Sequence, residues 1–159
     1  MKYIYYLFII LSLLSCKKTS QIKIGVLQLI EHNALDSAYK GFVDGLKEAG
    51  YEDGKNIIID YQNAQGEQAN CITIGQKFIN DKSDLILAIA TPAAQAIANM
   101  TKDIPILITA VTDPADSKLV ADNNAPGGNV TGTSDLTPVE AQIELLKEII
   151  PNVKTVGLL

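Results

Sequence analysis

Strand-like and helix-like segments alternate along almost the whole chain, and this alternation limits the fold more than any other feature of the sequence. Apolar, strand-like runs occupy residues 22–29, 56–61, 84–90 and 104–109. Segments with helical spacing lie between them, at residues 35–49 and 67–80, and another begins at Thr91. Strands joined by helices are typical of βαβ units, so we expect an α/β fold built on a doubly wound parallel sheet. Right-handed crossovers leave few topologies, and we predict the common strand order 2-1-3-4.

The pattern changes after the fourth strand. Residues 111–129 are rich in turn residues, and residues 130–134 form a short extended piece. A further helix is predicted over residues 137–150, and the apolar run at residues 154–159 is typical of a strand cut off in mid-run. We therefore expect an N-terminal lobe at residues 22–134. Residues 135–159 are expected to hold a hinge, starting near residues 132–135, and the first helix and strand of a second, missing lobe.

The N-terminal residues have the composition of a targeting segment. Lys2 precedes an apolar run at residues 3–14, which is shorter than the roughly 20 residues needed to span a bilayer. Leu13-Leu14-Ser15-Cys16 resembles the lipobox of bacterial lipoproteins, in which the cysteine becomes the lipidated N-terminus. We expect residues 1–15 to be a lipoprotein signal peptide and residues 16–21 to be a tether lipidated at Cys16. An ordinary signal peptide that contains a cysteine is the alternative.

Charge and composition argue against several classes of partner. The formal net charge is −5, and the lysines are scattered, so nucleic acid and anionic surfaces are not expected partners. Cys71 is the only cysteine besides Cys16, and it sits in a helical pattern typical of a small buried hydrophobe. His32 is the single histidine, so a metal site is not expected. No nucleophile is flanked by a base and an orienting carboxylate, so we expect no cofactor and no enzymatic activity.

Polar residues gather where the predicted parallel strands end. In an open α/β sheet, ligands bind outside the carboxyl ends of the strands, where the strand order reverses. For order 2-1-3-4 this point lies between the first and third strands. The residues that follow the strand ends are Gln28, Glu31, His32 and Asn33 after the first strand, Thr91 after the third, and Thr109, Thr112 and Asp113 after the fourth.

Thr91-Pro92-Ala93-Ala94 is the sharpest local signal in this group. Thr91 is expected to cap the third helix, with Pro92 at its first position, where no N–H is needed. The small side chains of Ala93 and Ala94 leave their N–H groups accessible, and such a helix start attracts anions through its donors and its dipole. One interpretation is a site for the carboxylate of a small ligand. The other is a well-capped helix with no ligand.

Two further residues have both a functional and a structural interpretation. Asp113 can neutralise a ligand ammonium, or it can be the turn residue of an Asp-Pro pair. His32 can hydrogen-bond a ligand, or it can be a solvated loop histidine. The residues alone do not decide between these interpretations.

The mature sequence resembles bacterial ABC-transporter substrate-binding proteins of the TrpX-like kind. The resemblance covers nearly all of the chain after residue 21. It is carried by IGVLQLIEH (24–32), ALD (34–36), GFVDGL (41–46), IDYQNAQ (59–65), AIATPAAQ (88–95), TAVTDP (109–114), PGGNVTG (126–132) and SDLTP (134–138).

The resemblance implies a type I periplasmic-binding-protein fold with two lobes, of which this chain has the N-terminal half. It also implies an amino acid ligand, aromatic by preference (tryptophan, phenylalanine or tyrosine), clamped between the lobes and delivered to an ABC permease in the membrane. The carboxylate would then face the third helix, and the ammonium would face Asp113 or Asp135. An apolar slot for the side chain would be formed by Leu29, Ile30 and Val111.

Three other functions stay open from the sequence. The chain can be a truncated lipoprotein without a transport role, or an extracytoplasmic sensor domain that reports ligand without transport. A hydrolase on this fold is the remaining alternative.

Overall fold

The computed structural model describes residues 21–157. The predicted signal peptide and Cys16 lie outside the described residues. Within them, five parallel strands form one sheet in the order β2-β1-β3-β4-β5. The strands are β1 (Ile22–Gln28), β2 (Ile57–Asn63), β3 (Leu85–Ile89), β4 (Ile106–Val111) and β5 (Val130–Ser134). The predicted order 2-1-3-4 is confirmed, and the short extended piece joins the sheet as a fifth strand.

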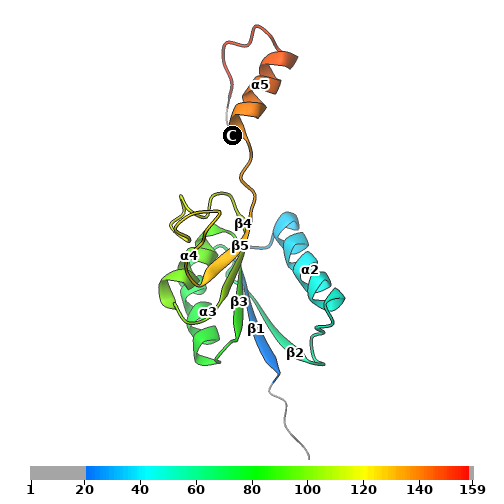
Figure 1. Cartoon of the computed structure of the whole chain (residues 1–159), viewed down its shortest axis with the longest axis vertical. Helices are drawn as coiled ribbons and strands as arrows, with labels where there is room; N and C mark the ends of the chain where they lie inside the picture. Colours follow the sequence, from blue (N-terminus) through cyan, green and yellow to red (C-terminus); the bar gives the residue numbers. More distant parts are fainter. Residues whose placement is uncertain (1–20, 158–159) are drawn as a thin grey trace, which may run out of the picture.

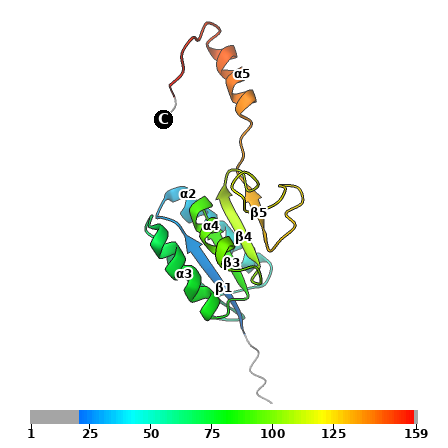
Figure 2. The same cartoon turned by 90° about the vertical axis from the view of Figure 1, so that its left-hand side faces the viewer.

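Two layers of helix cover the sheet (Figures 1 and 2). Helix α2 (Asn33–Glu48) lies on one face, and α3 (Gln68–Asn80) and α4 (Thr91–Met100) lie together on the other. Buried side chains of β1 alternate between these layers. Leu27 packs with α3 and α4, whereas Ile24 and Val26 pack toward α2. Burial on both faces explains why the strands are continuous apolar runs.

The central strand and α3 approach each other closely at Gly25. A Cβ at this position would come within 2.7 Å of ring atoms of Phe78, which is fully buried. Glycine is therefore required here by space, because any side chain would have to displace a packed aromatic ring. This contact fixes the position of α3 along β1.

The fourth strand begins two residues later than predicted. Pro105 precedes Ile106 and has no N–H to donate, so the strand is expected to start after it. The carbonyl of Pro105 still accepts a bond from the Ile86 N–H (3.0 Å), which aligns β4 with β3. The strand also runs past the predicted end to Val111, with a register irregularity between Ile108 and Val111 and a positive φ of 55° at Ala110.

Helix α5 (Val139–Ile149) stands apart from the sheet, at the end of an extended segment formed by residues 135–138 (Figures 1 and 2). None of its residues is buried. The apolar side chains Val139, Ile143, Leu145 and Ile149 are exposed. The predicted helix is confirmed, but its apolar face has no packing partner among the described residues.

The strand predicted at residues 154–159 does not form in the described part of that run. Residues 154–157 have no regular structure, and residues 158 and 159 lie outside the described residues. A strand needs a neighbour to satisfy its backbone groups, and no other strand of residues 21–157 lies beside this segment.

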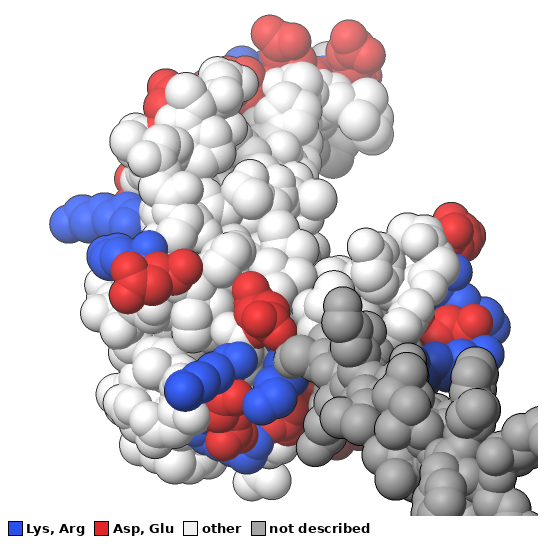
Figure 3. All heavy atoms as spheres, turned by 60° about the horizontal axis from the view of Figure 1, so that its bottom comes forward, with Lys and Arg blue, Asp and Glu red and all other residues white. Residues whose placement is uncertain are grey.

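Charges of both signs are mixed on the surface. Figure 3 shows lysine and acidic side chains next to each other in several groups, which are separated by uncharged surface. Lys77 bridges Asp60 and Asp81, which joins α3 to β2, and Lys40 pairs with Asp44 along α2. In the part of the chain that is described, no helix has both the length and the hydropathy that crossing a membrane requires.

Candidate functional site

The carboxyl ends of β1, β3 and β4 meet at one edge of the sheet, beside the point where the strand order reverses. Gln28 ends β1 and is paired in register with Ile89, which ends β3. Ala90 follows Ile89, and its N–H donates to the carbonyl of Thr109 in β4 (3.0 Å). The structure therefore brings the predicted residues after the first, third and fourth strands to the same edge.

Gln28 is the most unusual polar residue at this edge, because it is fully buried. Its Nε2 donates to the carbonyl of Ile30 (2.9 Å) and to Oδ1 of Asp36 in the first turn of α2 (2.6 Å). These two bonds orient the amide, since only the nitrogen can donate. The other amide atom, Oε1, is buried and has no hydrogen-bond partner among residues 21–157.

The start of α4 differs from the prediction in its cap. Ala90 occupies the N-cap position with φ 84° and ψ 151°, and no side chain caps the helix. Thr91 is already helical, so the prediction that it caps the helix is wrong. The sharp turn at Ala90 explains the shift, because its carbonyl accepts the first helical bond from the Ala94 N–H (3.0 Å).

Fewer backbone N–H groups are therefore free at the start of α4 than the sequence predicted. The N–H of Ala94 is used inside the helix, contrary to the expectation that it stays free. The N–H groups of Thr91 and Ala93 have no acceptor among the described residues, and Pro92 has no N–H. The side chains of Ala93 and Ala94 are fully buried in the core and anchor the helix start against the sheet. Two backbone donors and the positive end of the helix dipole remain at the sheet edge.

Asp113 organises a turn. Its Oδ1 accepts from the N–H groups of Ala115 (3.0 Å) and Asp116 (3.1 Å) and from Nδ2 of Asn123 (2.9 Å). The hydrogen bond from Asn123, together with those from the N–H groups of Asp116 and Ala115, lowers the pKa of this carboxyl although desolvation acts to raise it. The structure thus gives Asp113 the turn role that its Asp-Pro sequence allows.

His32 caps α2. Its Nδ1 accepts from the N–H of Ala34 (3.2 Å), and the helix begins at Asn33, two residues earlier than predicted. The side chain is exposed. Histidine is not among the usual N-cap residues, so helix-capping rules applied to the sequence miss this contact.

The ends of β4 and β5 are tied together. Oγ of Ser134 donates to the carbonyl of Thr112 (2.6 Å), and the N–H of Asp135 donates to the carbonyl of Val111 (3.2 Å). Thr109 and Thr133 are joined by their hydroxyl groups (3.0 Å). Val111 is fully buried in the core, so its side chain does not form the expected apolar slot. Ile30, by contrast, is largely exposed beside the end of β1.

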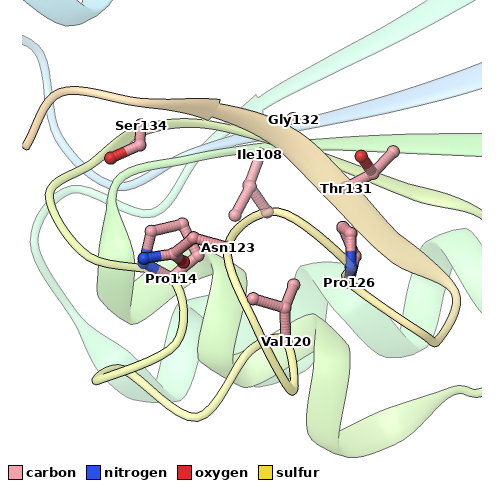
Figure 4. A pocket seen from close by; sticks show the side chains of 8 residues that line it. All are labelled: Ile108, Pro114, Val120, Asn123, Pro126, Thr131, Gly132 and Ser134. Atoms are coloured by element: carbon pink, nitrogen blue, oxygen red, sulfur yellow. The ribbon is translucent and has the colours of Figure 1, made fainter.

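Two hollows lie beside β5, and almost none of the residues predicted to bind ligand line them. A small one of about 70 Å³ is enclosed by β4, β5 and the loop between them (Figure 4). A larger one of about 470 Å³ lies between α2 and the outer strands, and Phe42 and Leu107 help to line it. Thr109 is the one residue of the predicted binding site among its lining residues. Neither contains Gln28 or Thr91. We place the candidate site at the strand ends, where the unpaired polar groups are, and not in either hollow.

Asp36 is the residue that sequence reasoning missed. In the sequence it is an ordinary acidic residue in the first turn of a helix, eight positions after Gln28. No short motif connects the two, and only the turn between β1 and α2 brings them into contact. The predicted residues otherwise fall into two groups. Gln28, Thr91, Ala93 and Thr109 lie near the reversal point, whereas Asp113, Thr112 and Asp135 lie toward β5.

The chain is similar to proteins of one known family. Residues 23–159 match the family described as ABC transporter substrate binding protein. A protein of Clostridioides difficile (strain R20291), described as tyrosine-binding protein, is 51% identical over 146 residues, which are 90% of this chain and 42% of that protein.

Two solved structures show the same arrangement. One is the ligand-free, open structure of a substrate binding protein with adhesive properties from Clostridium difficile, with a TM-score of 0.78 and 54% identity over 86% of this chain and 46% of that one. The other is an ABC domain from Streptococcus pneumonia in complex with L-Trp, with a TM-score of 0.80 and 48% identity over 87% of this chain and 46% of that one. The chain therefore spans less than half the length of these relatives.

Proposed function

Because the chain belongs to the family of ABC transporter substrate-binding proteins, we propose that it binds an aromatic amino acid and serves an ABC importer as its extracytoplasmic receptor. The observation that carries the ligand class is the pair of relatives at about half identity, one described as tyrosine-binding and one solved with L-Trp. The proposed partners are the amino acid and a permease in the membrane. The proposal needs no cofactor and no catalytic step.

The carboxylate of the ligand is proposed to sit at the start of α4. The N–H groups of Thr91 and Ala93 are unpaired within residues 21–157, and the helix dipole adds positive potential at the same place. A carboxylate accepts hydrogen bonds and donates none, so it is complementary to these free N–H groups. Thr109 and Thr112 are proposed to lie around the ligand from the β4 side.

The segment after β5 is proposed to be the hinge between two lobes. Residues 135–138 are extended and exposed, and α5 beyond them has an apolar face with no partner in the described part of the chain. A second lobe would cover that face, and the greater length of the relatives supports one. Closure of two lobes about such a segment is a known way to enclose a small ligand.

Lipid anchoring at Cys16 remains part of the proposal. It rests on the sequence pattern of the leader, which lies outside the described residues. A lipidated cysteine would hold the receptor at the outer side of a membrane near its permease, with residues 16–21 as the tether.

A thermal-shift survey with the standard amino acids tests the ligand class. A ligand that binds only the folded protein raises its stability by about 2.7 kcal/mol at a hundred times its Kd. We expect the largest rise in Tm with tyrosine, tryptophan or phenylalanine. A larger rise with aliphatic or charged amino acids would refute the aromatic preference, and no rise with any amino acid would refute the receptor function.

A further inference from the structure

The buried amide of Gln28 presents an acceptor that no described residue uses. The side chain is fully buried, and Oε1 is the buried side-chain polar atom left without a hydrogen-bond partner among residues 21–157. Leaving such an atom unpaired is unfavourable, because it loses its hydrogen bond to water and gains none in return. Buried polar groups without a partner are rare in native proteins, and one explanation is that a group outside the chain supplies the missing bond.

We propose that Gln28 Oε1 accepts a hydrogen bond from the α-ammonium of the ligand, and that Asp36 positions the amide for this task. The proposal rests on the function proposed above and adds the ammonium subsite to it. Asp36 was not among the residues singled out by the sequence, and it acts through Gln28 without touching the ligand.

The orientation of the amide is fixed by its neighbours. Nε2 donates both to Asp36 Oδ1 (2.6 Å) and to the carbonyl of Ile30 (2.9 Å), and both partners are acceptors only. A flipped amide would set Oε1 against a carboxylate and a carbonyl. The free atom must therefore be the oxygen, which suits a donor such as an ammonium. The hydrogen bond from Nε2 to Asp36 is charge-assisted, because Asp36 is a carboxylate, and such bonds are stronger than those between neutral groups.

The position of Gln28 matches the proposed carboxylate site. It ends the central strand β1 on the α2 face of the sheet and pairs in register with Ile89 of β3. Ala90, at which α4 begins, follows Ile89 directly. An unpaired acceptor at the end of β1 and unpaired donors at Thr91 and Ala93 thus flank the reversal point. An amino acid carries an ammonium and a carboxylate on one carbon, and this pair of groups is complementary to both.

Asp113 and Asp135 are less suitable acceptors for the ammonium. Oδ1 of Asp113 already accepts three hydrogen bonds within its turn. Asp135 follows the edge strand β5, which is separated from β1 by β3 and β4. The carboxylate of Asp36 also makes the electrostatic potential near Gln28 more negative, which favours a cation there.

Access to Oε1 requires a small rearrangement. The chain after β1 folds back over the side chain, since the carbonyl of Ile30 accepts from its Nε2. Residues 30 and 31 are exposed and form no part of a strand or helix, so they can shift at little cost while His32 keeps its cap on α2 and Asp36 holds the amide.

Calorimetric titration with two ligands tests the proposal. The ligands are L-tyrosine and its deaminated analogue 3-(4-hydroxyphenyl)propanoate, and the measured quantity is the ratio of their Kd values. We expect the wild-type protein to prefer tyrosine by about tenfold or more, the usual worth of a charge-assisted hydrogen bond. In Gln28→Met the preference should fall to about one, because tyrosine binding weakens and analogue binding does not.

The matched control is Gln62→Met. Gln62 lies on β2 and makes the same kind of contact, with its Nε2 donating to Asp60 Oδ1 (2.6 Å), but it is not at the end of β1. This variant should keep the wild-type ratio. A thermal melt of both variants confirms that each is folded before titration.

The positioning role of Asp36 has its own pair of variants. Asp36→Ala removes the acceptor that orients the amide, so the preference for tyrosine should fall about threefold or more. Asp36→Asn keeps an oxygen that can accept from Gln28 Nε2, and it should restore part of the preference. An equal loss for both ligands in Asp36→Ala would mean that Asp36 only stabilises the fold.

The outcomes separate the two proposals. If the wild-type protein binds tyrosine but Gln28→Met keeps the preference, Oε1 serves an internal water and the ammonium subsite is refuted, while the receptor function stands. The same holds if the wild-type protein binds both ligands equally well, or if Gln28→Met weakens both ligands equally. If the wild-type protein binds no aromatic amino acid, the receptor function fails and the subsite fails with it.

Discussion

The backbone N–H of Ala90 donates to the carbonyl of Thr109 (3.0 Å), which joins the end of β3 to β4 at the residue where the chain turns into α4. Ala90 makes this turn with φ 84° and ψ 151°, a conformation that glycine adopts far more readily than alanine. Strain of this kind is typical of functional sites. Here it aims the start of α4 across the carboxyl ends of the strands.

Substitutions at Ala90 should report this strain. Ala90→Gly is expected to raise the free energy of unfolding by up to about 1 kcal/mol, because glycine adopts the required dihedral angles without a clash. Ala90→Val should lower it by about 2 kcal/mol, because a branched Cβ is least compatible with positive φ. Urea denaturation of the three proteins measures both changes. A glycine variant that is clearly less stable than the natural protein would show that Ala90 is not strained.

The close approach of β5 to β4 at Gly132 gives a second prediction. A Cβ at this position would lie 2.0 Å from the carbonyl oxygen of Ile108, and backbone cannot move aside as a side chain can. Gly132→Ala should therefore destabilise the protein by about 2 kcal/mol or more and loosen β5 from the sheet.

The control for Gly132 is a glycine with free space around it. A Cβ at Gly41 in α2 meets no atom within 4 Å, and alanine is the better helix former by about 1 kcal/mol. Gly41→Ala should therefore be neutral or stabilising in the same denaturation experiment. Equal destabilisation by both substitutions would refute the special role of the Ile108 contact.

The pairing of Asp60 with Lys77 predicts a change of stability in acid. Burial opposes ionisation of Asp60, but the hydrogen bonds from Lys77 and Gln62 outweigh it and lower the pKa of the carboxyl from 3.8. A carboxyl with a lowered pKa binds fewer protons when the protein is folded. Its stabilising effect is therefore complete above about pH 4 and is lost as the pH falls through the lowered value.

Asp60→Asn should remove this effect. Lys77 is nearly half exposed, so the pair is screened and the loss at pH 7 should be only about 0.5–1 kcal/mol. The difference between variant and natural protein should shrink as the pH falls below about 4. Denaturation at several pH values measures it, and a difference that is constant from pH 7 to pH 2 would contradict the assignment.

Helix α5 should be the least stable helix of this chain. It has 11 residues, none of them buried, and isolated helices of this length are marginal in water. Amides of α5 should exchange with solvent almost as fast as in an unfolded peptide, whereas those of α4, which has five buried residues, should be protected. Hydrogen exchange read by mass spectrometry makes the comparison. Equal protection of both helices would show that α5 packs against something in the isolated chain.

Much of the fold follows from hydrophobic pattern alone. The runs that became β1 and β3 are continuous apolar segments because helices cover both faces of the sheet, and this made them visible in the sequence. The handedness of the crossovers left few topologies, and the common order 2-1-3-4 chosen among them is the one that the sheet has. The short piece at Val130–Ser134 was harder to assign, because a strand at a sheet edge is buried only at Val130 and carries a weak pattern.

The site was less predictable because it depends on long-range contacts and unusual caps. Helix-capping rules pointed to Thr91, but the cap is Ala90, whose backbone conformation no propensity scale would assign to alanine. His32 and Asp36 both act at the start of α2, one as an N-cap and one as a partner for Gln28. Their roles depend on how the chain turns after β1, and that turn carries no signature of its own. The strand-end rule indicated this edge of the sheet but did not rank the residues that lie there.

The central claim is that this chain is part of a receptor for an aromatic amino acid. Titration of the purified protein with L-tyrosine and with L-tryptophan in a calorimeter tests it most directly. The account predicts saturable, one-to-one binding of at least one of them, with no comparable heat from L-lysine or L-glutamate. Absence of binding by both aromatic ligands at millimolar concentration would contradict it.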